Sequence, residues 1–154
     1  MIDAIEQLLI ERDCQRLILS YATLVDGGQI DRALDLFIDE AVLIGPRNNE
    51  RLEGIDAIRS AYSSMPPRAL RHFYTNIVVD VIAPDRARAT ANVLLYTGSV
   101  AKSGSLPRRD PDVGIGTMVD DVVRTEAGWR FQRRQGALCF APTNPDDAFG
   151  LADG

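Results

Sequence analysis

The stretch RHFYTNIVVDVIAPDRARATANVLLY (residues 71–96) contains two runs of largely alternating residues joined by Ala-Pro-Asp. A period of two is typical of β-strands, which also favour Val, Ile, Thr and aromatic residues. The Ala-Pro-Asp segment (83–85) suits a tight turn, so we expect the two strands to pair antiparallel. From this hairpin onward, the chain has the period of strands.

Two further strands are predicted C-terminal to this hairpin. GIGTMVDDVVRTE (114–126) and GWRFQRRQGALCF (128–140) have similar composition, and Glu-Ala-Gly between them predicts a second tight turn. A Gly-, Ser-, Pro- and Arg-rich stretch (99–113) separates the two hairpins and predicts a mobile loop. We assign residues 1–140 to a single domain and the turn-rich residues 141–154 to a tail.

A helical period replaces the strand period in the first third of the chain. Apolar residues recur at three- and four-residue steps up to Val25, which predicts one long helix ended by Asp-Gly-Gly (26–28). A short helix should follow, with Asp31 as its N-cap and Phe37 among its inward residues. The run EAVLIGP then predicts a strand, and EGIDAIRSAYSSMPP predicts a third helix ended by paired prolines.

Helices followed by long antiparallel strands define an α+β protein with the helices on one side of the sheet. Twist accumulates along strands of ten or more residues, so we expect the sheet to be strongly curved. Such a sheet, wrapped partly around the long helix, forms a cone with a pocket inside.

The composition excludes several classes of partner and cofactor. A net charge of −5 argues against nucleic acids and anionic membranes, and no apolar run approaches the length of a membrane span. The acidic N-terminus resembles neither a secretory signal nor a transit peptide. One histidine and two separated cysteines, Cys14 and Cys139, match no zinc site, and no glycine-rich nucleotide motif is present. We therefore predict a cytoplasmic protein without metal or cofactor.

Two residues far apart in the sequence form the predicted catalytic pair. Asp26 continues the inward row of the long helix, where a carboxylate without a partner would be costly. His72, the only histidine, opens the first long strand on a face that strict alternation shares with Tyr74, Asn76 and Val78. A hydrogen bond from the ring to Asp26 would fix the tautomer of His72 and make it a general base. The opposite face is expected to be more purely apolar, with Phe73, Ile77, Val79 and Val81.

Each of these residues also has a structural interpretation. A lone histidine at the start of a strand is often a satisfied core residue, and Asp26 before two glycines suits a solvated helix end. Tyr21, one turn before Asp26, suits core packing. The catalytic hypothesis depends on Asp26 and His72 together.

The same residues resemble the SnoaL-like branch of the NTF2-like superfamily, which implies a cystatin-like cone fold. The resemblance covers roughly residues 3 to 140, including ILSYATLVDGGQIDRALDLF and LEGIDAIRSAY. Its marks are Tyr-x₄-Asp at Tyr21 and Asp26, His-x₃-Asn at His72 and Asn76, and the Gly-Trp-Arg that opens the last strand. The superfamily includes dehydratases, dehydrohalogenases, isomerases, polyketide cyclases and non-enzymes, so the fold alone does not define a reaction.

The resemblance also implies roles for individual residues. Scytalone dehydratase and hexachlorocyclohexane dehydrochlorinase use an aspartate–histidine dyad, and its positions correspond to Asp26 and His72. The dehydrochlorinase has a lysine where this chain has Tyr21, and a cysteine where it has Leu70. A tyrosine hydroxyl suits a substrate oxygen, so the dehydratase pattern fits better.

We therefore predict a cofactor-independent lyase-type enzyme that eliminates water, or a related leaving group, from a small apolar cyclic compound. His72 would take the proton, Asp26 would orient it, Tyr21 would donate to a substrate oxygen, and Asn76 would position the ring or substrate. Strand alternation places Arg134 opposite Trp129, so a role of Arg134 in the pocket requires a bulge. The remaining predicted pocket residues are Leu17, Phe37, Tyr62, Leu70, Tyr74, Val119 and Phe131.

Two other functions stay open from the sequence. One is a ketosteroid-isomerase-like or polyketide-cyclase-like enzyme, which would need an oxyanion hole in the same cone. The other is a non-catalytic ligand-binding or assembly protein like the small subunit of ring-hydroxylating dioxygenases. In each case we predict a homodimer or homotrimer formed through the apolar outer face of the sheet.

Overall fold

The computed structural model describes residues 2–47 and 49–141, which form three helices and a six-stranded sheet. The strand order is β2-β1-β6-β5-β4-β3, with β1 and β6 parallel and the other neighbours antiparallel. The predicted α+β class is confirmed. In chain order the elements are α1 (Ala4–Asp26), α2 (Ile30–Leu34), β1 (Phe37–Ile44), β2 (Arg51–Glu53), α3 (Ile55–Ser64), β3 (Ala69–Ala83), β4 (Arg86–Gly98), β5 (Arg109–Thr125) and β6 (Gly128–Leu138).

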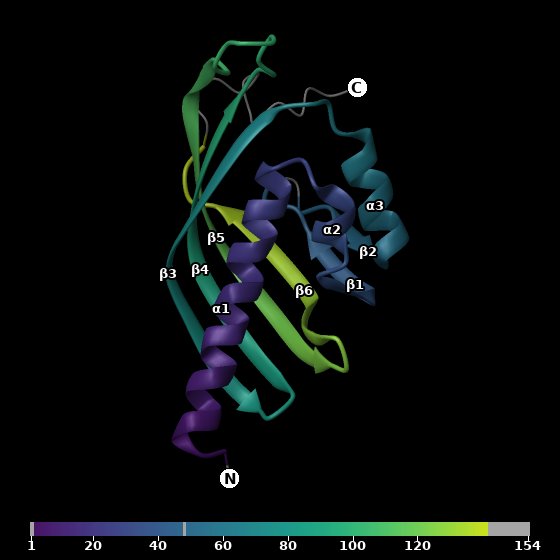
Figure 1. The fold of residues 1–154 in the computed structure, drawn as a ribbon, viewed down its shortest axis with the longest axis vertical. Coiled ribbons are helices and arrows are strands. Elements are labelled where there is room, and N and C mark those ends of the chain that lie inside the picture. Colours follow the sequence, from purple (N-terminus) through teal and green to yellow (C-terminus); the bar gives the residue numbers. More distant parts are fainter. Residues whose placement is uncertain (1, 48, 142–154) are drawn as a thin grey trace.

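Helix α1 lies along the concave side of the curved sheet, and α2 and α3 lie beside β1 and β2 (Figure 1). Asp3 caps the start of α1 by accepting a hydrogen bond from the backbone N–H of Glu6 at 2.8 Å. The inner stripe of α1 packs into the main apolar core, as the helical period predicts. Each fully buried Leu or Ile of such a stripe contributes roughly 1.5–3 kcal/mol to stability. The buried residues of α1 are Ile10, Cys14, Leu17, Ile18, Tyr21, Ala22 and Val25.

The segment after α1 differs from the prediction. Phe37 is the first residue of β1, not part of a helix, because it pairs with Phe131 of β6 in the sheet. Helix α2 begins at Ile30, so its N-cap is Gln29 and not Asp31. The carboxylate of Asp31 instead forms an ion pair with Arg59 of α3. Cross-strand pairing outweighs the local helical period here.

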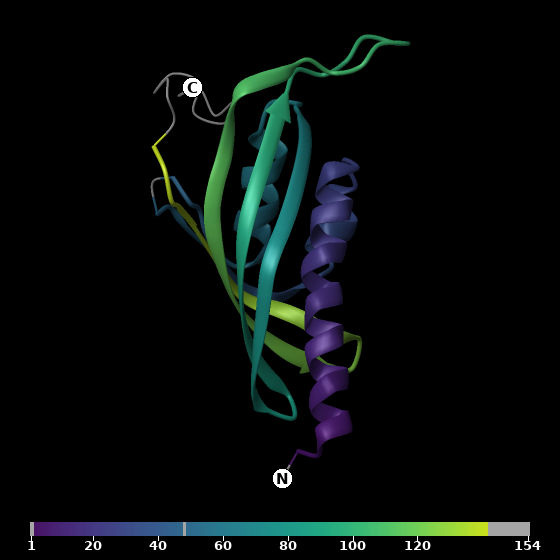
Figure 2. The same cartoon turned by 90° about the vertical axis from the view of Figure 1, so that its left-hand side faces the viewer.

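Both predicted hairpins are confirmed, since β3 pairs antiparallel with β4 and β5 with β6. Strand β5 begins at Arg109, so the connection after β4 is shorter than the predicted 99–113 loop. The ends of β4 and β5 project beyond the body of the protein (Figure 2). The short strand β2 is not predicted by the sequence pattern, and the predicted tail lies outside the described residues from 142 onward.

A bulge in β3 reverses the predicted faces of its second half. Asn76 has a left-handed φ of 52°, and the β3–β4 register shifts between Thr75 and Val78. Strict alternation is therefore wrong beyond Thr75. Asn76 and Val78 are exposed, and so is Phe73 on the outer face. The residues that pack against the core from this half of β3 are Ile77, Val79 and Val81.

The left-handed backbone at Asn76 gives a direct prediction for stability. Asn76→Gly should keep the stability of the parent, whereas Asn76→Val should lower the free energy of unfolding by about 1–2 kcal/mol. The cause is the clash of a β-branched side chain with its own backbone at positive φ. Urea unfolding measures both, with Thr75→Val as the control at an exposed neighbour. Full tolerance of valine at position 76 would contradict the bulge.

Within the described ranges, no helix has both the length and the apolar character needed to cross a membrane. Of the two cysteines, Cys139 is exposed and Cys14 is buried in α1. Burial, aided by the nearby charge of Asp13, raises the pKa of the Cys14 thiol to about 12. Cys14 is therefore an inert core residue.

Candidate active site

The structure brings Asp26 and His72 into direct contact. Asp26 is the last residue of α1, and His72 lies near the start of β3. Nδ1 of the ring donates to one carboxylate oxygen at 2.6 Å, and the backbone N–H of His72 donates to the other at 2.8 Å. A carboxylate accepts hydrogen bonds, so this contact assigns the proton of the neutral ring to Nδ1. One carboxylate thus fixes both the backbone and the ring of His72.

The second ring nitrogen of His72 is left free. Among the described residues, Nε2 has no hydrogen-bond partner, and the side chain is 14% exposed, against 11% for Asp26. The ring stacks on Tyr74, with 6.2 Å between centroids and 17° between planes. The imidazole is therefore oriented at one nitrogen and accessible at the other, which is the arrangement of a general base.

A second polar group lies deeper between α1, α3 and the sheet. The hydroxyls of Tyr21 and Tyr62 form a hydrogen bond that links α1 to α3. The ring of Tyr21 packs edge-on against Phe37 and Phe131, at 5.9 and 5.8 Å between centroids. Tyr62, predicted only as a pocket wall, is thus a hydrogen-bonding partner of the predicted donor.

Arg134 is fully buried beside these tyrosines. Its Nε and Nη2 donate to the two carboxylate oxygens of Asp120 at 2.9 and 3.2 Å, and Nη2 also donates to the hydroxyl of Tyr74 at 3.1 Å. The guanidinium carbon lies 4.1 Å from the centroid of the Tyr21 ring and 4.3 Å from that of Phe131. The third nitrogen, Nη1, is buried and has no partner in the described part of the chain.

The bulge that Arg134 requires is present in β6. Asp121 pairs with Arg133 and Val122 pairs with Phe131, so Gln132 is an extra residue on β6. This residue reverses the alternation, and both Phe131 and Arg134 therefore point into the protein.

Burial keeps the inner tyrosines protonated. Burial raises the pKa of Tyr21 well above its usual value and raises the pKa of Tyr74 to about 12. The positive charge of Arg134 lowers both pKa values, but by less than burial raises them. Burial also raises the pKa of Tyr62. For Arg134, burial lowers the pKa, but Asp120 and the tyrosines more than offset this and raise it overall. At neutral pH the site therefore contains three neutral hydroxyl donors and a permanent cation.

The buried tyrosines predict alkaline sensitivity. Since the pKa of Tyr74 is about 12 in the folded protein and 10 ordinarily, its contribution to stability is complete below pH 10 and lost toward pH 12. We expect the free energy of unfolding to fall across this window, by about 2 kcal/mol for Tyr74 alone. Urea titrations followed by the fluorescence of Trp129 measure the fall, which should be smaller in Tyr74→Phe. A pH-independent stability between pH 10 and 12 would contradict this.

The other predicted pocket residues divide into two groups. Leu17, Phe37 and Phe131 are buried in the core, and Leu70 packs against it. Val119 does not face the interior, because the inward side chain of β5 at this point is the neighbouring Asp120. Asn76 is turned outward by its bulge, away from His72 and Tyr74.

Asp120 is a site residue that the sequence analysis missed. Its signal is a carboxylate in the middle of an apolar strand, in the run TMVDDVV. Alternation places it on the same face as Met118 and Val122, where a charge requires a partner. The partner, Arg134, is recognisable only when the bulge in β6 is known.

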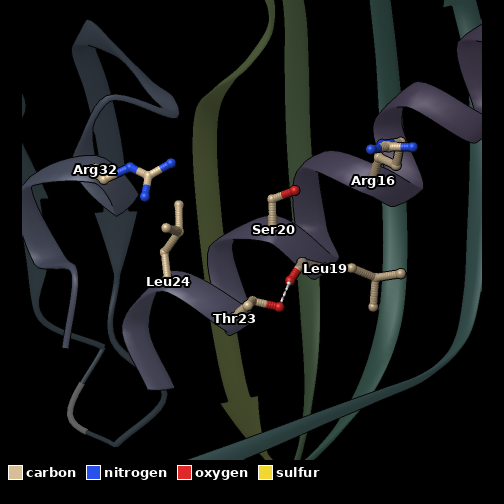
Figure 3. Close-up of a pocket in the computed structure, with 6 residues that line it drawn as sticks. All are labelled: Arg16, Leu19, Ser20, Thr23, Leu24 and Arg32. Carbon is tan, nitrogen blue, oxygen red and sulfur yellow. Dashed lines mark hydrogen bonds between the residues drawn. The ribbon is translucent and has the colours of Figure 1, made fainter. Parts of the chain in front are cut away.

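A hollow of about 370 Å³ lies on the outer side of α1, where Arg32 of α2 joins residues of α1 (Figure 3). The Thr23 hydroxyl at its edge donates to the Leu19 carbonyl at 2.9 Å. This hollow is open and contains none of the residues of the Asp26–His72 or Arg134 groups, so the chemistry locates the candidate site elsewhere. Across the described residues, no three His, Cys, Asp or Glu side chains gather as metal ligands.

Comparison with known proteins places the chain in a family. The SnoaL-like domain family matches residues 6–135. The chain belongs to the SnoaL-like family. The predicted resemblance is thereby confirmed, and with it the NTF2-like fold, whose superfamily includes dehydratases, isomerases and cyclases. No curated protein sequence matches this SnoaL-like chain significantly.

Solved structures share the fold of this SnoaL-like protein at low sequence identity. A predicted scytalone dehydratase from Novosphingobium aromaticivorans is 20% identical, with a TM-score of 0.76 and coverage of 90% of this chain and 89% of that chain. A predicted aromatic ring hydroxylase from the same organism is 26% identical, with a TM-score of 0.72 and coverage of 89% and 94%. A type 2 hexachlorocyclohexane dehydrochlorinase is 18% identical, with a TM-score of 0.73 and coverage of 92% and 94%.

Proposed function

We propose that this SnoaL-like protein is a cofactor-independent elimination enzyme acting on a small, mostly apolar cyclic compound. The observation that carries the proposal is the two-point contact of Asp26 with His72, which leaves Nε2 of the ring free. Removal of a proton from carbon requires a base oriented in this way. Two of the structural neighbours are named for eliminations, as a dehydratase and a dehydrochlorinase.

In the proposed step, Nε2 of His72 takes a proton from a substrate carbon, and the electrons of that C–H bond form a new double bond. The bond to the leaving oxygen breaks, and the proton from His72 goes to that oxygen, so that water departs and the base is regenerated. Asp26 stabilises the intermediate imidazolium. Within the Tyr21–Tyr62 pair one hydroxyl donates to the other, and the second hydroxyl donates its proton to a substrate oxygen.

An isomerase is the second candidate, and the buried donors favour it. The hydroxyls of Tyr21, Tyr62 and Tyr74 lie around Arg134, whose Nη1 has no partner among the described residues. Donors of this kind stabilise the enolate of a ketone. The same base would then move a proton between two carbons without loss of a leaving group.

The test uses scytalone and γ-hexachlorocyclohexane as first probes, in deuterated water. Loss of water or HCl supports elimination, whereas deuterium incorporation without loss favours the isomerase. Because His72 is the only histidine, protein labelled with ¹⁵N-histidine gives one imidazole to observe. We expect the Nδ1-protonated tautomer in the parent protein, and Asp26→Asn should lower its population. The Nε2-protonated tautomer in the parent protein would contradict the proposal.

The assembly and location belong to the same proposal. Phe73, Leu94 and Ile115 lie opposite one another across three strands on the outer face of the sheet, and Phe73 and Ile115 are exposed. This apolar row supports a homodimer or homotrimer formed through that face. Light scattering of Ile115→Glu against the parent tests it, since an unchanged mass would exclude this face. A cytoplasmic location is proposed on the two separated, unpaired cysteines.

A further inference from the structure

We propose that Asp120 is a positioning residue, which holds the Arg134 guanidinium so that its Nη1 is left free to bind the leaving group or substrate oxygen. This inference rests on the proposed function, because it assigns Asp120 a part in the same reaction. Asp120 touches no substrate in this scheme and acts through Arg134.

The register of the sheet sets the pair in place. Asp120 stands between Ala89 of β4 and Arg134 of β6, directly opposite each. Ala89 is fully buried and small, so the carboxylate meets the guanidinium with little steric competition from that side. The side chains of Asp120 and Arg134 are 1% and 0% exposed, so water does not compete for their hydrogen bonds.

The binding mode of the Asp120 carboxylate determines which nitrogen of Arg134 is left without a hydrogen-bond partner. Asp120 occupies the Nε and Nη2 edge of the guanidinium, and the Tyr74 hydroxyl takes a second hydrogen bond from Nη2. The rings of Tyr21 and Phe131 lie within contact of the guanidinium carbon. The guanidinium is thus held at one edge and against two rings, and Nη1 is the donor left over.

The depth of this unpartnered donor sets it apart from a surface ion pair. Arg68, paired with Asp110, also has an Nε without a partner among the described residues, but its side chain is 26% exposed, whereas that of Arg134 is 0% exposed. Buried polar groups are almost always hydrogen-bonded, and a charged donor without a partner is the most costly exception. A buried ion pair is also no efficient source of stability, since an apolar pair of similar size often serves as well. A substrate acceptor atom at Nη1 accounts for both features.

Asp121 provides a matched control on the adjacent position. It lies on the outer face, where its carboxylate accepts from Nε of Arg88 at 2.7 Å and lies 3.8 Å from Nη1 of Arg133. Asp121→Asn therefore removes the same chemical group from the same strand without touching the site.

The test is a double-mutant cycle on scytalone turnover with Asp120→Asn, Arg134→Gln and the double variant. If Asp120 acts through Arg134, Asp120→Asn lowers kcat about 10- to 100-fold with KM changed less than about threefold. The double variant then turns over within about twofold of Arg134→Gln, because the effect of Asp120 is lost with the arginine. Asp121→Asn keeps the parent kcat, and the ¹⁵N signals of His72 stay unchanged throughout, which a general loss of structure would not allow.

Three results would overturn the positioning role. They are a folded Asp120→Asn protein with parental kcat, losses that multiply in the double variant, and an Nε–H of Arg134 that keeps its protection from hydrogen exchange in Asp120→Asn. If Asp120→Asn does not fold, the kcat of the uncharged double variant is compared with the kcat of Arg134→Gln alone. If the parent protein does not convert scytalone, the proposed elimination of water from that compound is wrong. Hydrogen exchange at Nε–H of Arg134 still decides whether Asp120 positions the guanidinium.

Discussion

His72→Ala lowers kcat/KM for elimination by at least about 1,000-fold, because the chain has no second imidazole to act as the base. The ring lies near the surface of the site, with 14% of the side chain exposed, so its removal opens only a small cavity. We therefore expect the circular dichroism spectrum and the unfolding midpoint to stay close to those of the parent. Steady-state rates with the compound that the parent converts give the measurement.

Asp26→Asn is the companion variant. The amide keeps the size of the carboxylate but can donate to Nδ1, which reverses the tautomer and removes the negative charge beside the imidazolium. We expect a loss of about 100- to 10,000-fold in kcat, with substrate binding nearly retained. A folded His72→Ala protein with the parental rate would remove the basis for the proposed enzyme, whatever Asp26→Asn does.

Arg134→Met lowers the free energy of unfolding by about 3–5 kcal/mol, the largest stability effect we expect from a single substitution. The cause is the carboxylate of Asp120, which is 1% exposed and would lose its only cationic partner in the described structure. Burial raises the pKa of Asp120 even beside Arg134, so the carboxyl in Arg134→Met gains stability by taking up a proton as the pH falls. The loss should accordingly be larger at pH 8 than at pH 5.

The control removes both members of the pair. Asp120→Leu combined with Arg134→Met leaves no buried charge, so most of the lost stability should return. Asp121→Ala, which breaks the ion pairs with Arg88 and Arg133 on the outer face, should cost about 1 kcal/mol or less. Urea unfolding is followed through Trp129, the only tryptophan. A cost below 1 kcal/mol for Arg134→Met would show that the pair is not buried as described.

The sequence pattern was sufficient for most of the fold because the elements are long. Helix α1 has 23 residues with a continuous inner stripe, and β3 to β6 each have at least 11, so their periods stand out. The short elements α2, β1 and α3 were predicted as well, but the bounds of α2 were wrong and β2 was not predicted. The five residues of α2 and the three of β2 are too few to show a period, and Phe37 was assigned to the wrong element.

The contacts at the candidate site were predicted in part. Asp26 and His72 each stood out as a polar group at the end of an apolar pattern, and the structure brings them together. The environment of Arg134 was not predictable, because its inward direction depends on one extra residue at Gln132. Asp120 was not predicted as a site residue, because strict alternation along β6 turns its partner Arg134 outward.

The amino-acid sequence by itself determined the helices, the long strands, the two hairpins and the two candidate catalytic residues. These follow from side-chain periods and turn residues, which act over a few positions along the chain. Only the tertiary structure decided which side chains of β3 and β6 point inward beyond Asn76 and Gln132. A bulge forms where two strands pair, and one additional residue reverses every side chain after it, so the buried Asp120–Arg134 pair exists only once the sheet has assembled.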